Sequence, residues 1–325
     1  MNVLVTGAGS RIGQAVIRLI NSSKQKHRIV AADYFGDSVG FFWSSKYYIL
    51  PDILKTNVNQ KNWLHSIEKI VKKNGINLII PGVDFELSLF SKFKFFLEKK
   101  YNLKVIISDP NVINIFNNKL KTYNFLKNNN IDCAYTCEYS SRSFFFKYIN
   151  NNKFILKPSI GHTSKNVFLL KNKKNIKHLS KNIDKPILQE FLSGSEYTCG
   201  TIIQNKSIFS NIILKRKLKH GNTVLATRVD DHEIVDYINK IVKASNFFGP
   251  INFQLIKTKD GPRLLEINPR FSGTSYTRYL FGLNEFDVLV KILENRNFSL
   301  KKLKNGTVIK YTDDFFISEK ENKFI

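Results

Sequence analysis

The segment Glu266-Ile267-Asn268-Pro269-Arg270, the most informative of this chain, directly follows the apolar run Pro262-Arg263-Leu264-Leu265. Residues two positions apart on an extended strand project from the same face, so Glu266 and Asn268 present a carboxylate and an amide side by side. Both groups supply hard oxygen atoms, which Mg²⁺ requires when it bridges phosphates. Pro269 ends the strand, and Arg270 adds a forked cation suited to a phosphoryl oxygen. The segment therefore predicts a metal and phosphate site at the end of a strand.

A second apolar strand precedes this segment. Gln254 lies within residues 251–255, and the turn at 259–262 reads as the connection of a hairpin. Such a hairpin would gather Gln254, Glu266 and Asn268 into one oxygen-rich site. The alternative is a hairpin whose polar residues face solvent. The Gly/Ser/Thr-rich run at 271–275 that follows favours the site.

Length and composition indicate a folded protein of two or three domains, since 42% of the 325 residues are hydrophobic and 13% are aromatic. No apolar run approaches the roughly 20 residues that a membrane span needs, so none is expected. The first residues show neither a basic segment nor a cleavage-like site, which favours a cytoplasmic protein. The three cysteines, Cys133, Cys137 and Cys199, suit a reducing compartment and lack the partners of a zinc site.

The chain is strongly basic, with 51 Lys and Arg residues against 26 Asp and Glu and a formal net charge of +25. A charge of this size raises the question of nucleic-acid binding. Most of it is lysine spread over the whole chain, and no basic block is interleaved with aromatic residues. We therefore expect solvated lysine faces and no nucleic-acid partner, with attraction toward anionic substrates such as ATP.

The first third of the chain alternates apolar strands with amphipathic helices, which predicts an α/β domain with a parallel sheet. Its expected strands are 2–6, 28–33, 78–81 and 104–107, and its expected helices start near residue 12 and cover 63–73 and 86–99. The remainder predicts further strands at 154–157, 167–170, 187–190, 197–203 and 208–214, ahead of the hairpin. Helices are expected at 117–128, 234–244 and 283–293, and a short strand and tail at 301–325.

A glycine-rich turn after the first strand supports a second hypothesis. Glycines allow close approach of a phosphate to a helix N-terminus, and an acid after the second strand can bind a ribose. A Tyr-x-x-x-Lys spacing of the short-chain dehydrogenase type also occurs. Such turns are common in α/β folds that bind no dinucleotide, and this reading leaves 157–270 unexplained. The alternative is thus an NAD(P)-dependent oxidoreductase using Gly7, Gly9, Gly13, Asp33, Tyr123 and Lys127.

Lys157 ends a predicted strand and is followed by a loop at 158–167 that contains Gly, Ser and Thr. A lysine beside such a loop can neutralise phosphates while backbone N–H groups cover them. Some thirty residues later, the run 189–197 combines a strand end and a turn that could face a base edge, with Glu196 accepting from ribose hydroxyls. Each charged residue alone is more often surface decoration, so the order of the motifs carries the argument.

That order resembles the ATP-grasp superfamily, in particular its carbamoyl-phosphate-synthetase-like branch of carboxylate–amine ligases. The resemblance implies an α/β fold with an α+β ATP-grasp core. A Rossmann-like pre-ATP-grasp domain would cover 1–107 and the ATP-grasp domain 108–300. The latter would divide into a small lobe at about 118–190 and a large lobe at about 191–300, followed by a strand and tail at 301–325.

The resemblance also implies site residues, with ATP and Mg²⁺ or Mn²⁺ as cofactors. Arg270 and Lys157 would act in catalysis, Arg270 on the transferred phosphoryl group. Gln254, Glu266 and Asn268 match the metal ligands. The loop departs from the family in its low glycine content, with His162, Thr163 and Asn166 present; Asn tolerates the left-handed backbone that such a loop needs. The implied ATP contacts are Lys119, Lys157, Ser164, Glu190, Leu192, Glu196 and Arg216.

The implied activity is an ATP-dependent carboxylate–amine ligase that forms an amide through an acyl-phosphate. Its expected partners are a small-molecule or sugar-linked carboxylate and an amine, and a homodimer is a further expectation. The chain lacks a second synthetase half and a glutaminase, so carbamoyl phosphate synthesis is not implied. The run 271–278 resembles ligases of surface-polysaccharide or amino-acid-conjugate biosynthesis. The expected substrate contacts are Gly7, Gly9, Ser272, Thr274 and Arg278.

Overall fold

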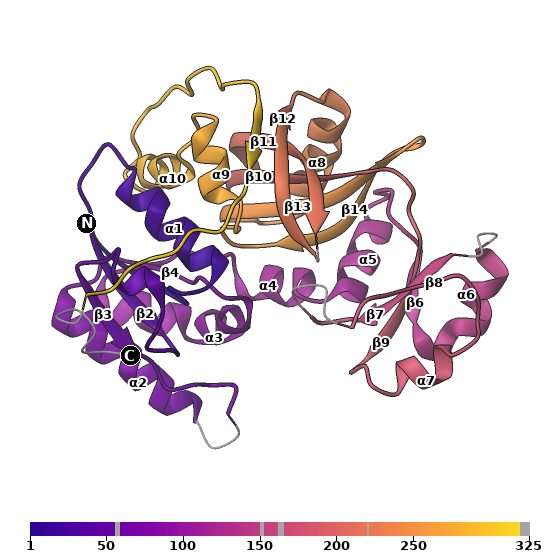
Figure 1. Ribbon diagram of the computed structural model, residues 1–325, viewed down its shortest axis with the longest axis horizontal. Helices are drawn as coiled ribbons and strands as arrows, with labels where there is room; N and C mark the ends of the chain where they lie inside the picture. The colour runs from indigo at the N-terminus through magenta and orange to yellow at the C-terminus, as the bar shows by residue number, and fades with distance from the viewer. Residues whose placement is uncertain (56–58, 150–152, 162–165, 220, 319–325) are drawn as a thin grey trace.

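Three sheets organise the protein in the computed structural model, which describes residues 1–55, 59–149, 153–161, 166–219 and 221–318 (Figure 1). The N-terminal sheet is parallel, as predicted. Helices cover both faces of such a sheet, and its strands are therefore apolar along almost their whole length. Its strand order is β3 (Lys46–Ile49), β2 (Arg28–Asp33), β1 (Asn2–Thr6), β4 (Leu78–Ile80) and β5 (Lys104–Val105). The helices between these strands are α1 (Arg11–Asn21), α2 (Gln60–Asn74) and α3 (Asp84–Tyr101).

The second sheet is small and lies at the far end of the molecule from the N-terminal sheet (Figure 1). Its strands, all paired antiparallel, are β6 (Thr136–Glu138), β9 (Pro186–Glu190), β7 (Phe154–Pro158) and β8 (Phe168–Leu170). Three helices accompany it: α5 (Lys119–Asn128), α6 (Arg142–Tyr148) and α7 (Ile176–Ser180). A further helix, α4 (Pro110–Phe116), leads into this part from the N-terminal sheet.

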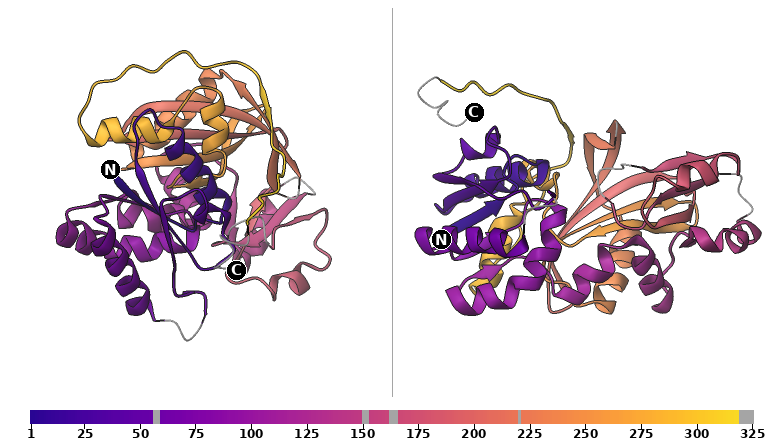
Figure 2. Two further views of the ribbon diagram at one scale, coloured as in Figure 1. Left: turned by 60° about the vertical axis from the view of Figure 1, so that its left-hand side comes forward. Right: turned by 90° about the horizontal axis from the view of Figure 1, so that it is seen from below.

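The third sheet is antiparallel and lies between the other two (Figures 1 and 2). Its strand order is β14 (Gly261–Asn268), β13 (Gly249–Thr258), β10 (Ser195–Gln204), β11 (Ser207–Lys219), β12 (Asn222–Val229) and β15 (Thr307–Ile309). The associated helices are α8 (His232–Ala244), α9 (Ser275–Leu280) and α10 (Glu285–Leu293). Among described residues, no helix combines the length and the apolar character needed to cross a bilayer.

The predicted elements are present, and several differ in extent: the strand expected at 104–107 ends at Val105, for example, and another strand is longer than expected. The strand expected at 208–214 continues through Lys219, so Lys215, Arg216 and Lys217 lie inside β11 and not after it. The lysines at 215, 217 and 219 are exposed and alternate with half-buried Arg216 and Leu218. This alternation is typical of an antiparallel strand with one solvated face. Its partner β12 was not predicted, because its sequence Asn-Thr-Val-Leu-Ala-Thr-Arg-Val is too polar to stand out.

The N-terminal sheet and the third sheet share one hydrophobic core. Ile17 of α1, Phe286 of α10 and Ile202 of β10 are all fully buried in the same cluster. The chain end also joins the two parts: β15 pairs with β12, and the following segment crosses to the N-terminal sheet (Figure 2). There Phe315 packs on Phe42, with ring centroids 5.5 Å apart. Burial of this apolar surface fixes the two parts against each other.

Candidate active site

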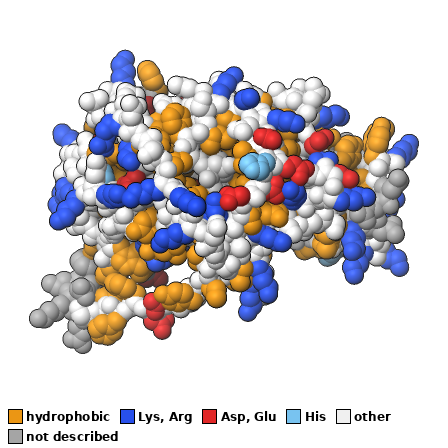
Figure 3. Space-filling view, turned by 90° about the horizontal axis from the view of Figure 1, so that it is seen from above, with side chains coloured by type: hydrophobic (Ala, Val, Ile, Leu, Met, Phe, Trp, Pro, Cys, Tyr) orange, Lys and Arg blue, Asp and Glu red, His pale blue; other side chains and the backbone are white. Residues whose placement is uncertain are grey.

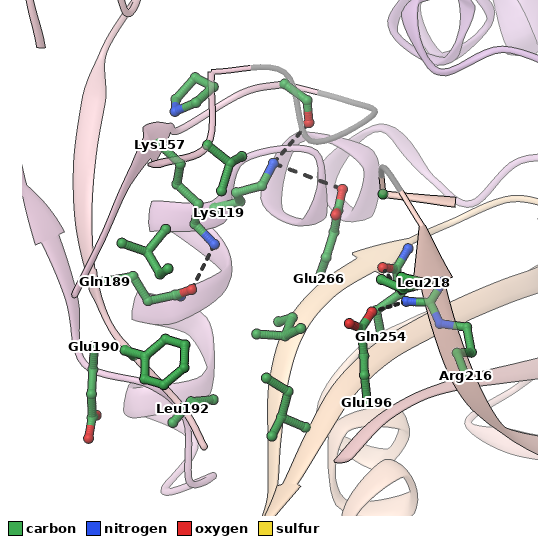
Figure 4. A pocket seen from close by; sticks show the side chains of 18 residues that line it. Lys119, Lys157, Gln189, Glu190, Leu192, Glu196, Arg216, Leu218, Gln254 and Glu266 are labelled. Atoms are coloured by element: carbon green, nitrogen blue, oxygen red, sulfur yellow. Dashed lines mark hydrogen bonds and ion pairs between the residues drawn. The ribbon is translucent and has the colours of Figure 1, made fainter. Parts of the chain in front are cut away.

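A pocket of about 260 Å³ lies between the small sheet and the β13–β14 hairpin (Figure 4). One part of its wall is apolar and includes Ile155, Val167 and Leu192, whereas three cations and two carboxylates form the rest. An apolar slot beside a charged end suits a nucleotide, whose base is flat and whose phosphates are anionic. This polar part consists of the side chains of Lys119, Lys157, Gln189, Glu196, Arg216, Gln254 and Glu266. Glu190 also lines the pocket, but its carboxylate points away from it (Figure 4).

Lys157 is held at the end of β7, and its side chain points into this pocket (Figure 4). It is 6% exposed, and its Nζ donates to Gln189 Oε1 at 2.7 Å. Burial lowers the pKa of Lys157 to about 7, helped by repulsion from Lys119 and opposed by Glu266. A buried amine with one neutral partner is poised to gain from an anion placed beside it.

Lys119 begins α5, where Asn118 caps the helix by accepting from the N–H groups of Leu120 and Lys121. The Lys119 ammonium donates to the carbonyl of Gly161 at 2.9 Å and lies 3.9 Å from Glu266 Oε1. It therefore stands between the start of the phosphate loop and the hairpin. Of the other loop predictions, Ser164, His162 and Thr163 lie outside the described residues. Asn166 adopts φ 58°, the left-handed backbone expected of it.

The β13–β14 hairpin pairs Gln254 with Glu266 and Asn252 with Asn268. Gln254 and Glu266 both line the pocket, so a carboxylate and an amide oxygen face the place where phosphates would lie. Asn268 is 5% exposed and lies beneath them. Its Oδ1 accepts from Arg270 Nη2 at 3.0 Å, and its Nδ2 has no hydrogen-bond partner among the described residues.

This donor set fits Mg²⁺ held partly by substrate phosphates, since such a metal needs only one or two carboxylates from the protein. Glu266 supplies the carboxylate and Gln254 an amide oxygen in the same wall. The Asn268 oxygen would have to be shared with Arg270. Within the described residues no group of three or more His, Cys, Asp or Glu could hold a metal alone. The metal and the nucleotide would therefore bind together.

Arg216 projects from β11 and contacts two other predicted site residues. Its Nη2 forms an ion pair with Glu196 and donates to Gln254 Oε1 at 3.1 Å. The predicted ribose ligand is thus paired with a cation on the same wall (Figure 4). A bound phosphate could take over Arg216 and leave the Glu196 carboxylate free to accept from hydroxyl groups.

The two predicted base contacts, Glu190 and Leu192, lie where β9 leads out of the small sheet. The Glu190 carboxylate points away from the pocket in Figure 4 and accepts from the N–H of Tyr135 at 3.2 Å. The N–H of Glu190 donates to the Tyr135 carbonyl at 2.9 Å. Glu190 thus anchors this wall through β6, and its side chain does not face the pocket.

Arg270 lies directly after β14 and is 9% exposed. Its Nε donates to Asp84 Oδ1 at 2.5 Å, its Nη1 to the Phe271 carbonyl at 2.9 Å, and its Nη2 to Asn268. Asp84 is the first residue of α3, so the N-terminal sheet's own helix fixes this arginine. Asp84 was not predicted as a site residue. Gln189 was not predicted either.

The predicted substrate contacts after β14 lie below the surface. Ser272, Thr274 and Arg278 are 5%, 6% and 1% exposed. Arg278 forms a two-contact ion pair with Glu285, at 2.6 Å and 3.0 Å, and donates to Thr274 Oγ1 at 2.7 Å. The guanidinium of Arg278 is thus paired with protein groups in the structure. Its direct contact with substrate stays a prediction.

The glycine-rich turn precedes α1, as predicted, with Gly7 in the left-handed region at φ 58°. The Gly9 N–H donates to Asp33 Oδ2 at 2.6 Å, and the Tyr34 N–H donates to Oδ1. The acid that a dinucleotide ribose would need is therefore used to hold the turn. Gly13 lies against the Gly7 carbonyl, and a Cβ there would approach it to 2.1 Å.

The oxidoreductase alternative gains no support. Tyr123 and Lys127 lie on α5, well away from the glycine turn of α1 (Figure 1). Tyr123 packs edge-on against Tyr135, and burial raises its pKa to about 12, the reverse of what a proton-donating tyrosine near neutral pH needs. The proposed catalytic pair is thus not brought to the proposed cofactor turn.

Comparison with known proteins gives two family matches. A model described as an ATP-grasp domain matches residues 116–274, and one described as a PylC-like N-terminal domain matches residues 3–107. Neither an oxidoreductase domain nor a dinucleotide-binding enzyme is among these matches.

Two curated proteins are similar in sequence. An uncharacterized protein of Methanocaldococcus jannaschii is 23% identical over 239 residues, which cover 71% of this chain and 60% of that protein. A carbamoyl-phosphate synthase of Methanobrevibacter smithii is 21% identical over 259 residues, which cover 74% of this chain and 70% of that protein. The chain thus spans less than two thirds of the length of the first of these relatives.

Solved structures share the fold. The N5-carboxyaminoimidazole synthetase from Staphylococcus aureus, complexed with ADP, has a TM-score of 0.72 at 14% identity, covering 95% of this chain and 79% of that one. The L-amino acid ligase from Bacillus licheniformis has a TM-score of 0.68 at 14% identity, covering 89% and 73%. The chain therefore carries a PylC-like N-terminal domain at residues 3–107 followed by an ATP-grasp domain at residues 116–274.

Proposed function

We propose that the protein is an ATP-dependent ligase that joins a small-molecule carboxylate to an amine. The observation that carries the proposal is the pocket wall in which Lys119, Lys157 and Glu266 meet. Two ammonium groups beside one carboxylate and an amide form a place for Mg·ATP. Names of similar proteins, an L-amino acid ligase and a carbamoyl-phosphate synthase, support a reaction of this class.

In the proposed reaction, a carboxylate oxygen attacks the γ-phosphorus of ATP, the bond to the ADP oxygen breaks, and an acyl-phosphate forms. The amine then attacks the acyl carbon, phosphate leaves, and the nitrogen loses a proton to give the amide. The main barrier is the approach of one anion to another. Lys157 and Lys119 would lower it by binding phosphate oxygens, and Arg270 would stabilise the transferred group.

Mg²⁺, when bound, would neutralise phosphate charge, and Glu266 with Gln254 would hold it. The sequence calls for no protein nucleophile, and none is needed for this chemistry. Glu196 is proposed to bind the ribose and Leu192 the base, with Lys119, Ser164 and Arg216 at the phosphates. A homodimer stays a prediction. The names of the similar proteins given above mention no sugar-linked substrate. The proposal is therefore limited to small-molecule acids.

A thermal-shift panel with Mg·ATP and NADH tests the proposal. Mg·ATP should raise the melting temperature, and Lys157→Ala and Glu266→Ala should remove that rise, whereas Lys72→Ala on the exposed side of α2 should not. NADH should have no effect. A shift with NADH alone, lost in Gly9→Val, would establish the oxidoreductase. Release of ADP and phosphate, screened across amino acids, other carboxylic acids and amines, then identifies the substrates.

A further inference from the structure

Basic side chains surround the loop at residues 271–275, which follows β14. The residues predicted to contact substrate, Ser272 and Thr274, are buried, and the accessible side chains around their loop are basic. Arg11 and Arg18 are exposed on α1, and Lys310 is half-buried on the segment after β15. Three parts of the chain that are far apart in sequence therefore bring positive charge to one place.

Distances join these groups around Gly273. Lys310 Nζ donates to the Gly273 carbonyl at 2.9 Å. A Cβ at Gly273 would lie 3.4 Å from Cβ of Arg11, so α1 begins directly against the same loop. Arg18 lies two turns further along the same face of α1, with its Cζ 3.7 Å from the ring centroid of Tyr276. The loop is thus flanked by α1 on one side and by the chain end on the other.

The charge of this group has no counter-charge in the part of the chain that the structure describes. Among the described residues, no carboxylate lies within ion-pair distance of Arg11, Arg18 or Lys310. The carboxylate of Glu285 below them is already paired with Arg278. Desolvation lowers the pKa of Lys310, and repulsion from Arg11, Arg18 and Arg278 lowers it further. Cations held close together repel one another, and a bound anion would offset this repulsion.

We propose that Arg11, Arg18 and Lys310 bind an oxyanion, a phosphate or a carboxylate, that the substrate carries in addition to its reacting group. This inference rests on the proposed ligase function and narrows its substrates to acids or amines with a second negative charge. The position fits, because Gly273 is three residues beyond Arg270 and the glycine turn of α1 lies alongside. Guanidinium forks and an ammonium group are the usual partners of such oxyanions.

Binding of inorganic phosphate and of succinate, titrated at constant ionic strength with chloride as the balancing ion, tests the site. Saturable binding should weaken about tenfold in Lys310→Gln and in Arg11→Gln, since each variant loses one charge-assisted contact. Lys310→Gln keeps a donor for the Gly273 carbonyl, so the segment stays in place. Lys301→Gln and Lys302→Gln, exposed on the segment that leads into β15, are charge-matched controls and should leave binding unchanged.

Phosphate could also enter the nucleotide pocket, and Lys157→Ala separates the two places. The proposal requires that phosphate binding persists in Lys157→Ala. If binding is lost there and retained in Lys310→Gln, the ion occupies the nucleotide pocket and the proposal is overturned; weakening by the control variants or an unsaturable response overturns it as well. A stronger response to phosphate than to succinate would indicate a phosphorylated substrate, and the reverse a dicarboxylate.

The two proposals fail separately. The phosphate and succinate titrations contain no ATP. They therefore measure binding at the site of Arg11, Arg18 and Lys310 independently of the thermal shifts with Mg·ATP and NADH. Mg·ATP should stabilise Lys310→Gln as it does the unaltered protein. If Mg·ATP does not stabilise the unaltered protein but phosphate still binds, the proposed ligase function is overturned and the proposed oxyanion site is retained.

Discussion

Arg270, directly after β14, is held by Asp84 of α3 in the N-terminal part of the chain, with Nε and Oδ1 2.5 Å apart. The two residues are 186 positions apart in sequence. Their side chains are 10% and 13% exposed, so the pair is shielded from water and rigid. The orientation of the proposed phosphoryl-stabilising arginine therefore depends on the N-terminal part of the chain.

Asp84→Asn should impair catalysis more than nucleotide binding. The variant keeps the shape of the side chain and removes the charge that orients Arg270. We expect turnover to fall by about ten- to a hundredfold, the equivalent of one hydrogen bond to a charged group, with the Mg·ATP affinity nearly unchanged. Single-turnover ADP release and a separate ATP titration measure the two quantities. Asp236→Asn, exposed on α8, is the control; equal loss of ATP affinity and turnover in Asp84→Asn would contradict the orienting role.

Periodic apolar segments made most of this fold predictable. The hairpin of β13 and β14 followed from alternating residues and a Gly-Pro turn, and its register does bring Gln254 opposite Glu266. The parallel N-terminal sheet followed from its alternation with helices. In both cases the deciding information is local, because each element is marked by its own pattern of apolar residues.

Contacts between distant segments were not predictable in the same way. Asp84 carries no local sign that it will meet Arg270, and Lys310 none that it will reach Gly273. Arg278 was expected to contact substrate because it closes the run 271–278, which follows the predicted metal ligands. In the structure Glu285, seven residues on, pairs with it, and the exposed fraction of an arginine cannot be known from its neighbours in sequence.

Binding of Mg·ATP should take up a proton through Lys157. Its pKa of about 7 means that much of the amine is neutral at pH 8, whereas phosphates beside it would favour the charged form. We expect ATP affinity to fall as the pH rises from 7 to 9, because the proton must then be taken from solution. Calorimetry in two buffers of different ionisation enthalpy measures the uptake.

The control for this prediction is Lys157→Met, which removes the titrating group and keeps an apolar stem of similar length. Binding will be weaker in this variant, and the uptake attributable to Lys157 should vanish. An identical proton uptake in Lys157→Met would assign it to another group. A pH-independent affinity in the unaltered protein would mean that Lys157 is already charged before ATP binds.

Gly200 should tolerate no side chain, because it faces the buried Arg278–Glu285 pair. A Cβ there would lie 2.2 Å from Arg278 Cζ and 2.5 Å from Glu285 Oε1. Gly200→Ala must displace a fully paired buried charge, so we expect a loss of about 3 kcal/mol or more in the free energy of unfolding. Gly282→Ala, where nothing lies within 4 Å of a new Cβ, should cost only the strain of its φ of 104°. Chemical denaturation compares them; equal losses would show that crowding is not the cause.

Glu86 should make the stability of the protein depend on pH. Its carboxylate is fully buried in α3 and accepts from Thr6 Oγ1 and from the Tyr34 hydroxyl, each at 2.5 Å. Desolvation raises its pKa to about 7 despite these two donors, and Asp33 raises it further. The unfolded chain ionises this group near pH 4.5, so between that pH and 7 only the folded state keeps the proton.

Stability due to Glu86 is therefore full below about pH 4.5 and is lost as the pH rises to about 7. Relative to Glu86→Gln, which cannot ionise, the unaltered protein should lose on the order of 3 kcal/mol of unfolding free energy over this interval. Urea denaturation of both proteins from pH 4.5 to 8 measures the difference, and Glu138→Gln, an exposed carboxylate on β6, serves as the control. Parallel curves for the unaltered protein and Glu86→Gln would show that Glu86 is ionised throughout, and the hydroxyls of Thr6 and Tyr34 would then suffice to hold a buried charge.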